Sequence, residues 1–96
     1  MGMAAAMNPK AHDRPRWTAA QMDAYERARD LLTAVIAAYS ACAETTDAPQ
    51  ETSRIEHEIT TLAIEQQTLT ADSTERVQEI IETFPALLAT IRESQQ

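Results

Sequence analysis

The sequence predicts an all-α fold, a small bundle of three helices that packs as a homodimer. Three observations favour this class. The 96 residues contain one Gly and four Pro, apolar residues recur at steps of three and four in three stretches, and no hairpin turn separates these stretches. The length suits one domain with a modest core. We expect that helical domain over residues 17–96, preceded by a flexible N-terminal arm at residues 1–16.

The first predicted helix, residues 18–43, is long and organises the other two. Thr18 and Gln21 have the capping-box spacing, in which each side chain bonds to the backbone amide of the other residue. The stretch from Leu31 to Ala43 carries no charge, so we expect it to be buried on more than one side. The apolar stripe of this helix comprises Tyr25, Ala28, Leu31, Leu32, Val35, Ala38, Tyr39 and Cys42, with Ile36 beside it.

The second predicted helix, residues 53–69, follows a loop at residues 44–52 that contains Pro49. Ser53 and Glu56 repeat the capping-box spacing at its start. Its stripe of Ile55, Ile59, Leu62, Gln66 and Leu69 is narrow. This helix is therefore the weakest of the three.

The third predicted helix, residues 73–94, has the most regular apolar stripe. Asp72 and Glu75 have the capping spacing at its start. Pro85 removes one backbone hydrogen bond and crowds the carbonyl of Ile81, so we predict a kink there, with a break into two short helices as the alternative. The stripe comprises Val77, Ile80, Ile81, Phe84, Leu87, Leu88 and Ile91.

The unequal lengths of the helices leave apolar surface on the first one, which favours a homodimer. The predicted assembly interface comprises Leu31, Leu32, Val35, Ile36, Tyr39, Phe84, Leu87, Leu88 and Ile91. A second candidate surface is an acidic ridge on the third helix, Glu75, Glu79 and Glu82, which could receive a basic partner. An ordinary solvated face is the alternative interpretation of this ridge.

The formal net charge of −7 is concentrated in the C-terminal half. Residues 44–96 contain eleven acidic residues against three Arg, and such a surface repels the phosphates of nucleic acid. The sequence therefore argues against general nucleic-acid binding. The basic arm around Lys10 and Arg16 leaves one alternative, a small regulator of the antitoxin or transcription accessory type that contacts nucleic acid through this arm.

Two residues invite a chemical interpretation, and neither pattern is complete. His57 lacks a second His four positions on, where Thr61 stands, and lacks a Glu three positions before it, where Arg54 stands, so it fits neither the zinc-protease nor the di-iron helix pattern. Cys42 lies on the apolar stripe, where a small buried residue is the ordinary role. A single Gly, at position 2, excludes phosphate-binding glycine loops. We expect no enzyme, no cofactor and no metal.

The sequence also predicts the cellular location, the type of source genome and the function of the protein. The uncharged run in the first helix is too short to cross a bilayer, and a lone cysteine favours the cytoplasm. One Lys against seven Arg, with abundant Ala, is typical of a GC-rich bacterial genome. The predicted function is a non-enzymatic helical protein–protein interaction or assembly module that acts through helix packing, with itself or another protein as partner.

Overall fold

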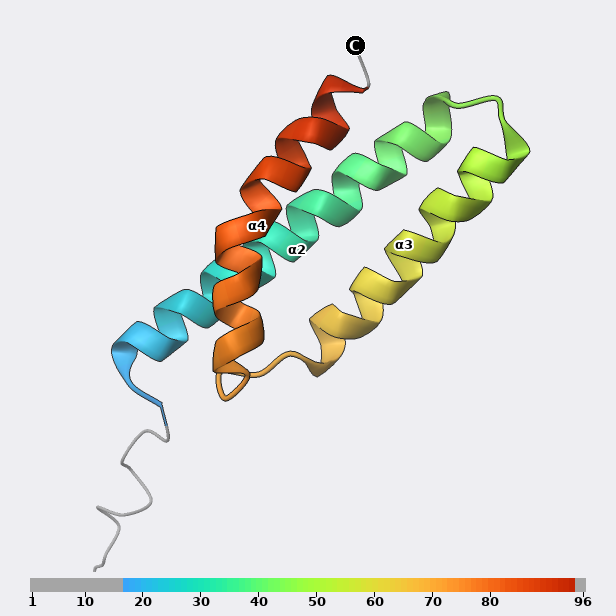
Figure 1. Ribbon diagram of the computed structural model, residues 1–96. Helices are drawn as coiled ribbons and strands as arrows, with labels where there is room; N and C mark the ends of the chain where they lie inside the picture. Colours follow the sequence, from blue (N-terminus) through green and yellow to red (C-terminus); the bar gives the residue numbers. More distant parts are fainter. Residues whose placement is uncertain (1–16, 95–96) are drawn as a thin grey trace, which may run out of the picture.

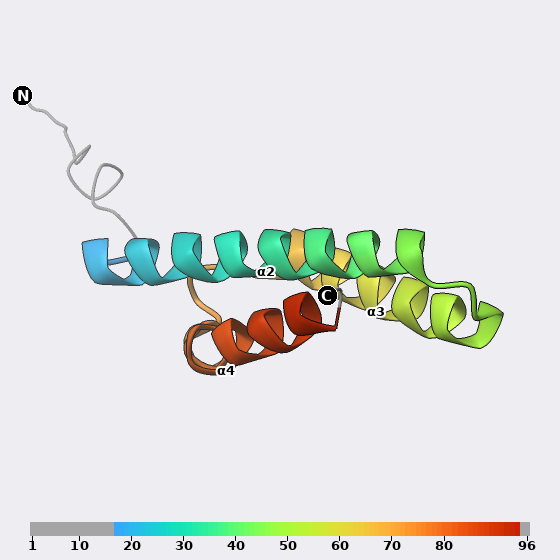
Figure 2. The same ribbon diagram turned by 90° about the horizontal axis from the view of Figure 1, so that it is seen from above.

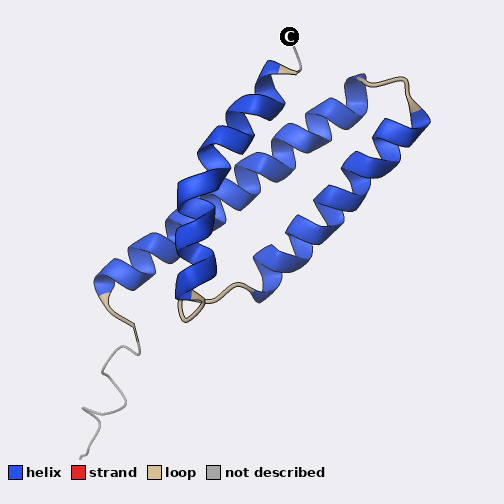
Figure 3. Ribbon diagram, viewed as in Figure 1, coloured by secondary structure: helices blue, strands red, loops and turns tan. Residues whose placement is uncertain are grey.

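A computed structural model describes residues 17–94 and folds them into three helices joined by short connections (Figure 1, Figure 3). Helix α2 spans Ala19–Thr45, α3 spans Pro49–Thr68 and α4 spans Thr74–Glu93. The predicted all-α class with three helices is confirmed for these residues. The predicted arm, residues 1–16, lies outside them, and a single chain lends no support to the predicted homodimer.

Helix α2 begins at the predicted capping box. The hydroxyl oxygen of Thr18 accepts from the backbone amide of Gln21 at 3.0 Å, and the side-chain oxygen of Gln21 accepts from the amide of Thr18 at 2.8 Å. Both orphan amides are thereby satisfied, which fixes the start of the helix. The helix ends at Thr45, where the amide of Thr46 donates to the carbonyl of Cys42.

Helix α3 begins at Pro49, so the predicted start at Ser53 is wrong by four positions. Proline is well suited to the first helical position, because its missing N–H would have no partner there and its φ angle is already helical. Glu51 lies in the first turn, where a negative charge complements the helix dipole. Ser53 lies inside the helix, and the predicted nine-residue loop shrinks to residues 46–48.

Helix α4 begins after Ser73, which makes no capping bond through its side chain. The predicted cap at Asp72 and Glu75 is therefore wrong. The carboxylate of Asp72 instead accepts a hydrogen bond from the indole nitrogen of Trp17. This bond ties the turn before α4 to the start of α2.

Pro85 lies inside α4, which continues through it as one helix. The alternative of two short helices is wrong, and the predicted kink is not supported. Pro85 is exposed, whereas Ile80, Phe84 and Ile91 of the same helix are buried. The stripe is buried on both sides of Pro85. This packing keeps α4 one continuous helix although one backbone hydrogen bond is missing.

The core lies along one side of α2. Leu32, Val35 and Ala28 are fully buried, whereas Thr33 and Ala37 of the same helix are exposed. The uncharged half of α2 is therefore buried where α3 and α4 pack against it and exposed to solvent elsewhere. The other helices and the turn between them supply Leu62, Leu69, Val77, Ile80, Phe84 and Ile91 to the same cluster.

Helices α3 and α4 both pack against α2, but no Cα atom of α3 lies within 8 Å of a Cα atom of α4. Figure 1 shows α4 crossing α2 and α3 running alongside α2 on the other side. Figure 2 shows α3 and α4 on separate parts of α2. A bidentate ion pair from Arg76 of α4 to Glu65 of α3 links the two helices near their connecting turn. Beyond it they diverge.

None of the helices within residues 17–94 carries an apolar stretch that could span a lipid bilayer.

Candidate functional site

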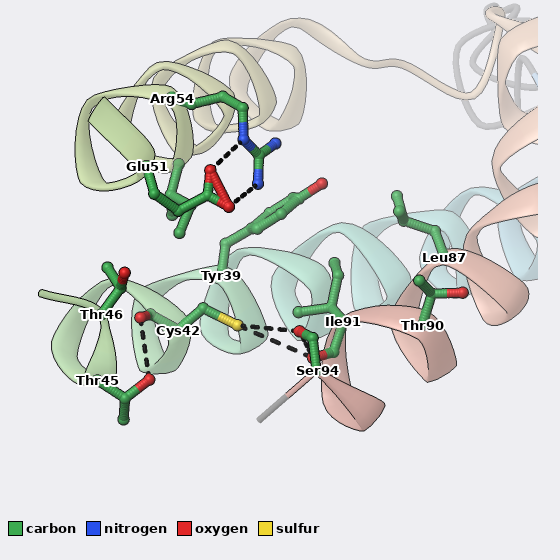
Figure 4. A pocket seen from close by; sticks show the side chains of 11 residues that line it. Tyr39, Cys42, Thr45, Thr46, Glu51, Arg54, Leu87, Thr90, Ile91 and Ser94 are labelled. Atoms are coloured by element: carbon green, nitrogen blue, oxygen red, sulfur yellow. Dashed lines mark hydrogen bonds and ion pairs between the residues drawn. The ribbon is translucent and has the colours of Figure 1, made fainter. Parts of the chain in front are cut away.

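The divergence of α3 and α4 leaves a cavity of about 550 Å³ over the C-terminal part of α2 (Figure 4). We call it the open groove. Tyr39 and Cys42 of α2 form its floor, Arg54 and Ile55 of α3 form one wall, and Leu87, Thr90, Ile91 and Ser94 of the α4 side form the other. A volume of this size is typical of ligand and partner sites in proteins.

The floor of the open groove combines an aromatic ring with a thiol. Tyr39 is half-buried, and this burial, followed by the negative charge of Glu58, raises the pKa of Tyr39 above its ordinary value. The Cys42 thiol lies 3.8 Å from the carbonyl oxygen of Ile91, to which it donates, and 3.8 Å from the hydroxyl of Ser94. The thiol therefore joins the ends of α2 and α4.

The α3 wall carries an ion pair at its rim. The Nε and Nη2 atoms of Arg54 donate to the two carboxylate oxygens of Glu51 at 2.8 and 3.1 Å. These bonds lower the pKa of Glu51 and raise that of Arg54. Both side chains are about half exposed, at 46% and 54%, so the pair occupies the groove edge without closing it. Ile55 behind the pair is buried.

The α4 wall places apolar and hydroxyl side chains at helical spacing. Leu87 and Ile91 are one turn apart and face the groove together with Thr90 and Ser94. The hydroxyl of Ser94 donates to the carbonyl of Ile91 at 2.7 Å. This wall carries no charged lining residue among those described, so α3 and the helix ends determine the electrostatics of the groove.

The structure divides the predicted assembly residues into two groups. Leu32, Val35, Phe84 and Ile91 are buried within the single chain, because the stripes of α2 and α4 close on each other. Three of the predicted residues, Tyr39, Leu87 and Ile91, come together in the open groove. The half-buried residues of the set are Leu31, Ile36, Tyr39, Leu87 and Leu88.

The sequence pattern does not reveal the α3 side of the groove. It places Glu51 in a loop and Arg54 at the edge of a helix that begins at Ser53. Pro49 followed by an acid two positions later is the available signal, since this pattern is typical of a helix start.

The predicted acidic ridge lies on the surface, with all three members exposed. Glu79 pairs with Arg76 at 2.7 Å, and the carboxylate of Glu82 accepts a hydrogen bond from the side-chain amide of Gln78 at 3.0 Å. Part of the ridge is thus engaged within α4 itself. Its role as a partner surface stays a prediction.

His57 is exposed on α3. Among residues 17–94, no three His, Cys, Asp or Glu side chains are grouped so that they could hold a metal ion. Comparisons with models of protein families, with curated proteins and with solved structures found no match. What is established for the described residues is the structural class, an all-α domain of three helices with an open groove.

Proposed function

We propose that this domain is a non-enzymatic protein-interaction module of the cytoplasm and that its open groove binds a helical segment of another protein. The single observation that carries the proposal is the divergence of α3 and α4 beyond the Arg76–Glu65 ion pair: each packs on α2, but no Cα atom of one lies within 8 Å of a Cα atom of the other. A floor and two walls made of helices surround the groove, and no helix among residues 17–94 occupies the space between the walls.

The shape and chemistry of the walls favour a helix as the bound segment. Helices that bind in grooves insert apolar side chains at positions i, i+3, i+4 and i+7. Leu87 on one wall and the Tyr39 ring on the floor, both half-buried, supply accessible apolar surface for such side chains, and the buried Ile55 and Ile91 lie behind them. The hydroxyls of Thr90 and Ser94 at the rim suit the polar edge of the same helix.

The surface favours a different protein over a second copy of this chain. Ile64 is the one large apolar side chain that is exposed among residues 17–94, at 56%. Within residues 17–94 a second copy therefore offers one exposed large apolar side chain, too few for an i, i+3, i+4, i+7 stripe. The net charge of −7 on each chain adds repulsion between copies.

A display library of helical peptides tests the proposal, because selection from a library does not require that the partner be identified. We expect selection on the full chain to enrich peptides with an apolar i, i+3, i+4, i+7 pattern. These peptides should lose binding to Leu87→Glu, which places a charge in the groove, and keep it with Ile64→Glu, which places the same charge outside the groove. Circular dichroism must show that both variants keep the wild-type helix content.

Two results would contradict the proposal. One is the absence of any enriched helical pattern. The other is enrichment of peptides that bind wild type and Leu87→Glu equally, because the binding surface would then lie elsewhere on the domain.

A further inference from the structure

The open groove lies where two helices end and one begins. Thr45 and Thr46, at the end of α2, line it together with Ser94, the C-cap of α4, while α3 starts beside them at Pro49. The C-terminus of a helix carries about half a negative charge, because its last carbonyl groups lack amide partners. The negative C-terminal ends of α2 and α4 both lie at this groove, together with the positive N-terminal end of α3.

The negative end of α2 has no compensating cation of its own. Its last turn contains no basic residue, and Glu44 and Asp47 lie at and just beyond that end. The end of α4 differs, since Arg92 lies in its last turn. The uncompensated dipole end of α2 therefore lies at the groove, and Glu44 and Asp47 are next to it in the chain although neither lines the groove.

The charges on the α3 wall do not reverse this sign. Arg54 is held by both carboxylate oxygens of Glu51, so the pair is neutral as a unit. Glu51 also lies in the first turn of α3 and offsets the positive dipole end of that helix. Glu58, one turn further along α3, adds a negative charge that acts on Tyr39.

The rest of the described domain has the same sign. Residues 17–94 contain five Arg and no Lys against fourteen Asp and Glu. Two of the five arginines, Arg54 and Arg76, are already paired with carboxylates. A basic partner is therefore attracted over the whole approach to the groove, and an acidic one is repelled.

From this charge complementarity we propose that the partner segment is a cationic amphipathic helix, with an apolar face in the open groove and Lys or Arg in a terminal turn beside the end of α2. This inference rests on the proposed function and adds the chemistry of the partner. The apolar face fills the space between Ile55 and Leu87, as any bound helix would. The cationic turn neutralises the carbonyl end of α2, and Glu44 and Asp47, which do not line the groove, add attraction from just outside it.

Three labelled peptides separate the contribution of charge from that of the groove. All share one leucine stripe at positions i, i+3, i+4 and i+7, and they carry Lys, Gln or Glu in both terminal turns. Fluorescence anisotropy measures their affinity for the full chain at low and high salt. We expect the Lys peptide to bind about tenfold more tightly than the Gln peptide, and the Glu peptide to bind more weakly than either. The differences should shrink as salt rises.

Variants of the protein show which residues bind the peptides and which cause the preference for Lys. Leu87→Glu should abolish binding of all three peptides, whereas the control Ile64→Glu should bind them as wild type does. The double variant Glu44→Gln, Asp47→Asn should reduce the Lys preference and leave the affinity for the Gln peptide unchanged.

Each contrary outcome has a distinct meaning. If the peptides bind with equal affinity and depend on Leu87, the cationic partner is wrong and the proposed function stands. If no peptide shows binding that depends on Leu87, the cationic partner and the proposed function are both wrong. If the Lys peptide binds equally well to Leu87→Glu, it binds an acidic surface outside the groove, and the inference is overturned. Self-association of the full chain that Leu87→Glu abolishes would also overturn it, because a second copy would then be the occupant.

Discussion

Arg76 is the side chain that links α3 to α4, and its replacement by Met tests how the two diverging helices are held. Its Nε and Nη2 atoms donate to both carboxylate oxygens of Glu65, the second at 2.7 Å, and its Nη1 donates to Glu79 at 2.7 Å. Its guanidinium carbon lies 5.5 Å from the ring centroid of Phe84. These bonds raise the pKa of Arg76. Arg76→Met keeps most of the aliphatic stem and removes all the polar contacts.

The contributions of these contacts can be weighed separately. Hydrogen bonds to a charged partner contribute about 1.5–3 kcal/mol, the pair with Glu79 about 0.2–0.5 kcal/mol, and the cation over the ring about 0.5–1 kcal/mol. Arg76 is 37% exposed and Glu65 is 23% exposed, so solvent screening reduces the sum. We expect Arg76→Met to lower the free energy of unfolding by about 2 kcal/mol.

Arg54→Met provides the matched control, because Arg54 also makes a bidentate pair but at an exposed edge and within one helix. Thermal unfolding of both variants can be followed by far-UV circular dichroism and by the fluorescence of the single Trp. For a domain of this size the expected loss in Arg76→Met corresponds to a fall in Tm of about 8–16 °C. Arg54→Met should shift the Tm far less. Equal shifts in the two variants would refute the view that Arg76 joins the helices.

Three further predictions concern the core, α4 and the groove floor. Leu32→Ala should lower the free energy of unfolding in urea by about 2–5 kcal/mol because Leu32 is fully buried, and an equal loss in Ile64→Ala would contradict this. Pro85→Ala should raise it by about 1–3 kcal/mol by restoring an amide donor to the carbonyl of Ile81; a loss of stability would show that Pro85 is needed. Because the folded-state pKa of Tyr39 is raised, its contribution to stability is complete below pH about 10 and is lost at higher pH. Urea titrations across this range should show a weaker alkaline loss in Tyr39→Phe, and an unchanged loss would contradict the assignment.

The helices could be predicted from the sequence because their signals are local. Thr18 and Gln21 form the predicted capping box, and the stripe of Val77, Ile80 and Phe84 is buried as its period indicates. Both signals depend only on residues within one or two turns of each other.

Two of the differences from the structure, one in α3 and one in α4, have a common physical origin. Each concerns a proline: Pro49 is predicted to exclude a helix, and Pro85 is predicted to kink α4 or, as the alternative, to break it. Proline is harmless at a first helical position, and packing of the stripe around Pro85 outweighs one lost backbone bond. The cost of a proline depends on its position in the helix and on tertiary packing. The pattern of apolar residues alone shows neither the position of Pro49 within α3 nor the packing around Pro85.

The open groove could not be predicted, because it depends on how the helices are arranged in space. The same apolar stripes would be compatible with a closed bundle in which α3 and α4 touch. The sequence did mark Tyr39, Leu87 and Ile91 as contact residues, but as an interface between two copies of the chain. Their position in one groove follows from the divergence of α3 and α4.

An NMR titration of the isotope-labelled full chain with the Lys peptide tests the central claim most directly. We predict that the largest shifts fall on Tyr39, Cys42, Ile55, Leu87 and Ile91, which surround the open groove, and that Leu87→Glu removes them. The account is contradicted if these resonances stay in place while those of the acidic ridge at Glu75, Glu79 and Glu82 move.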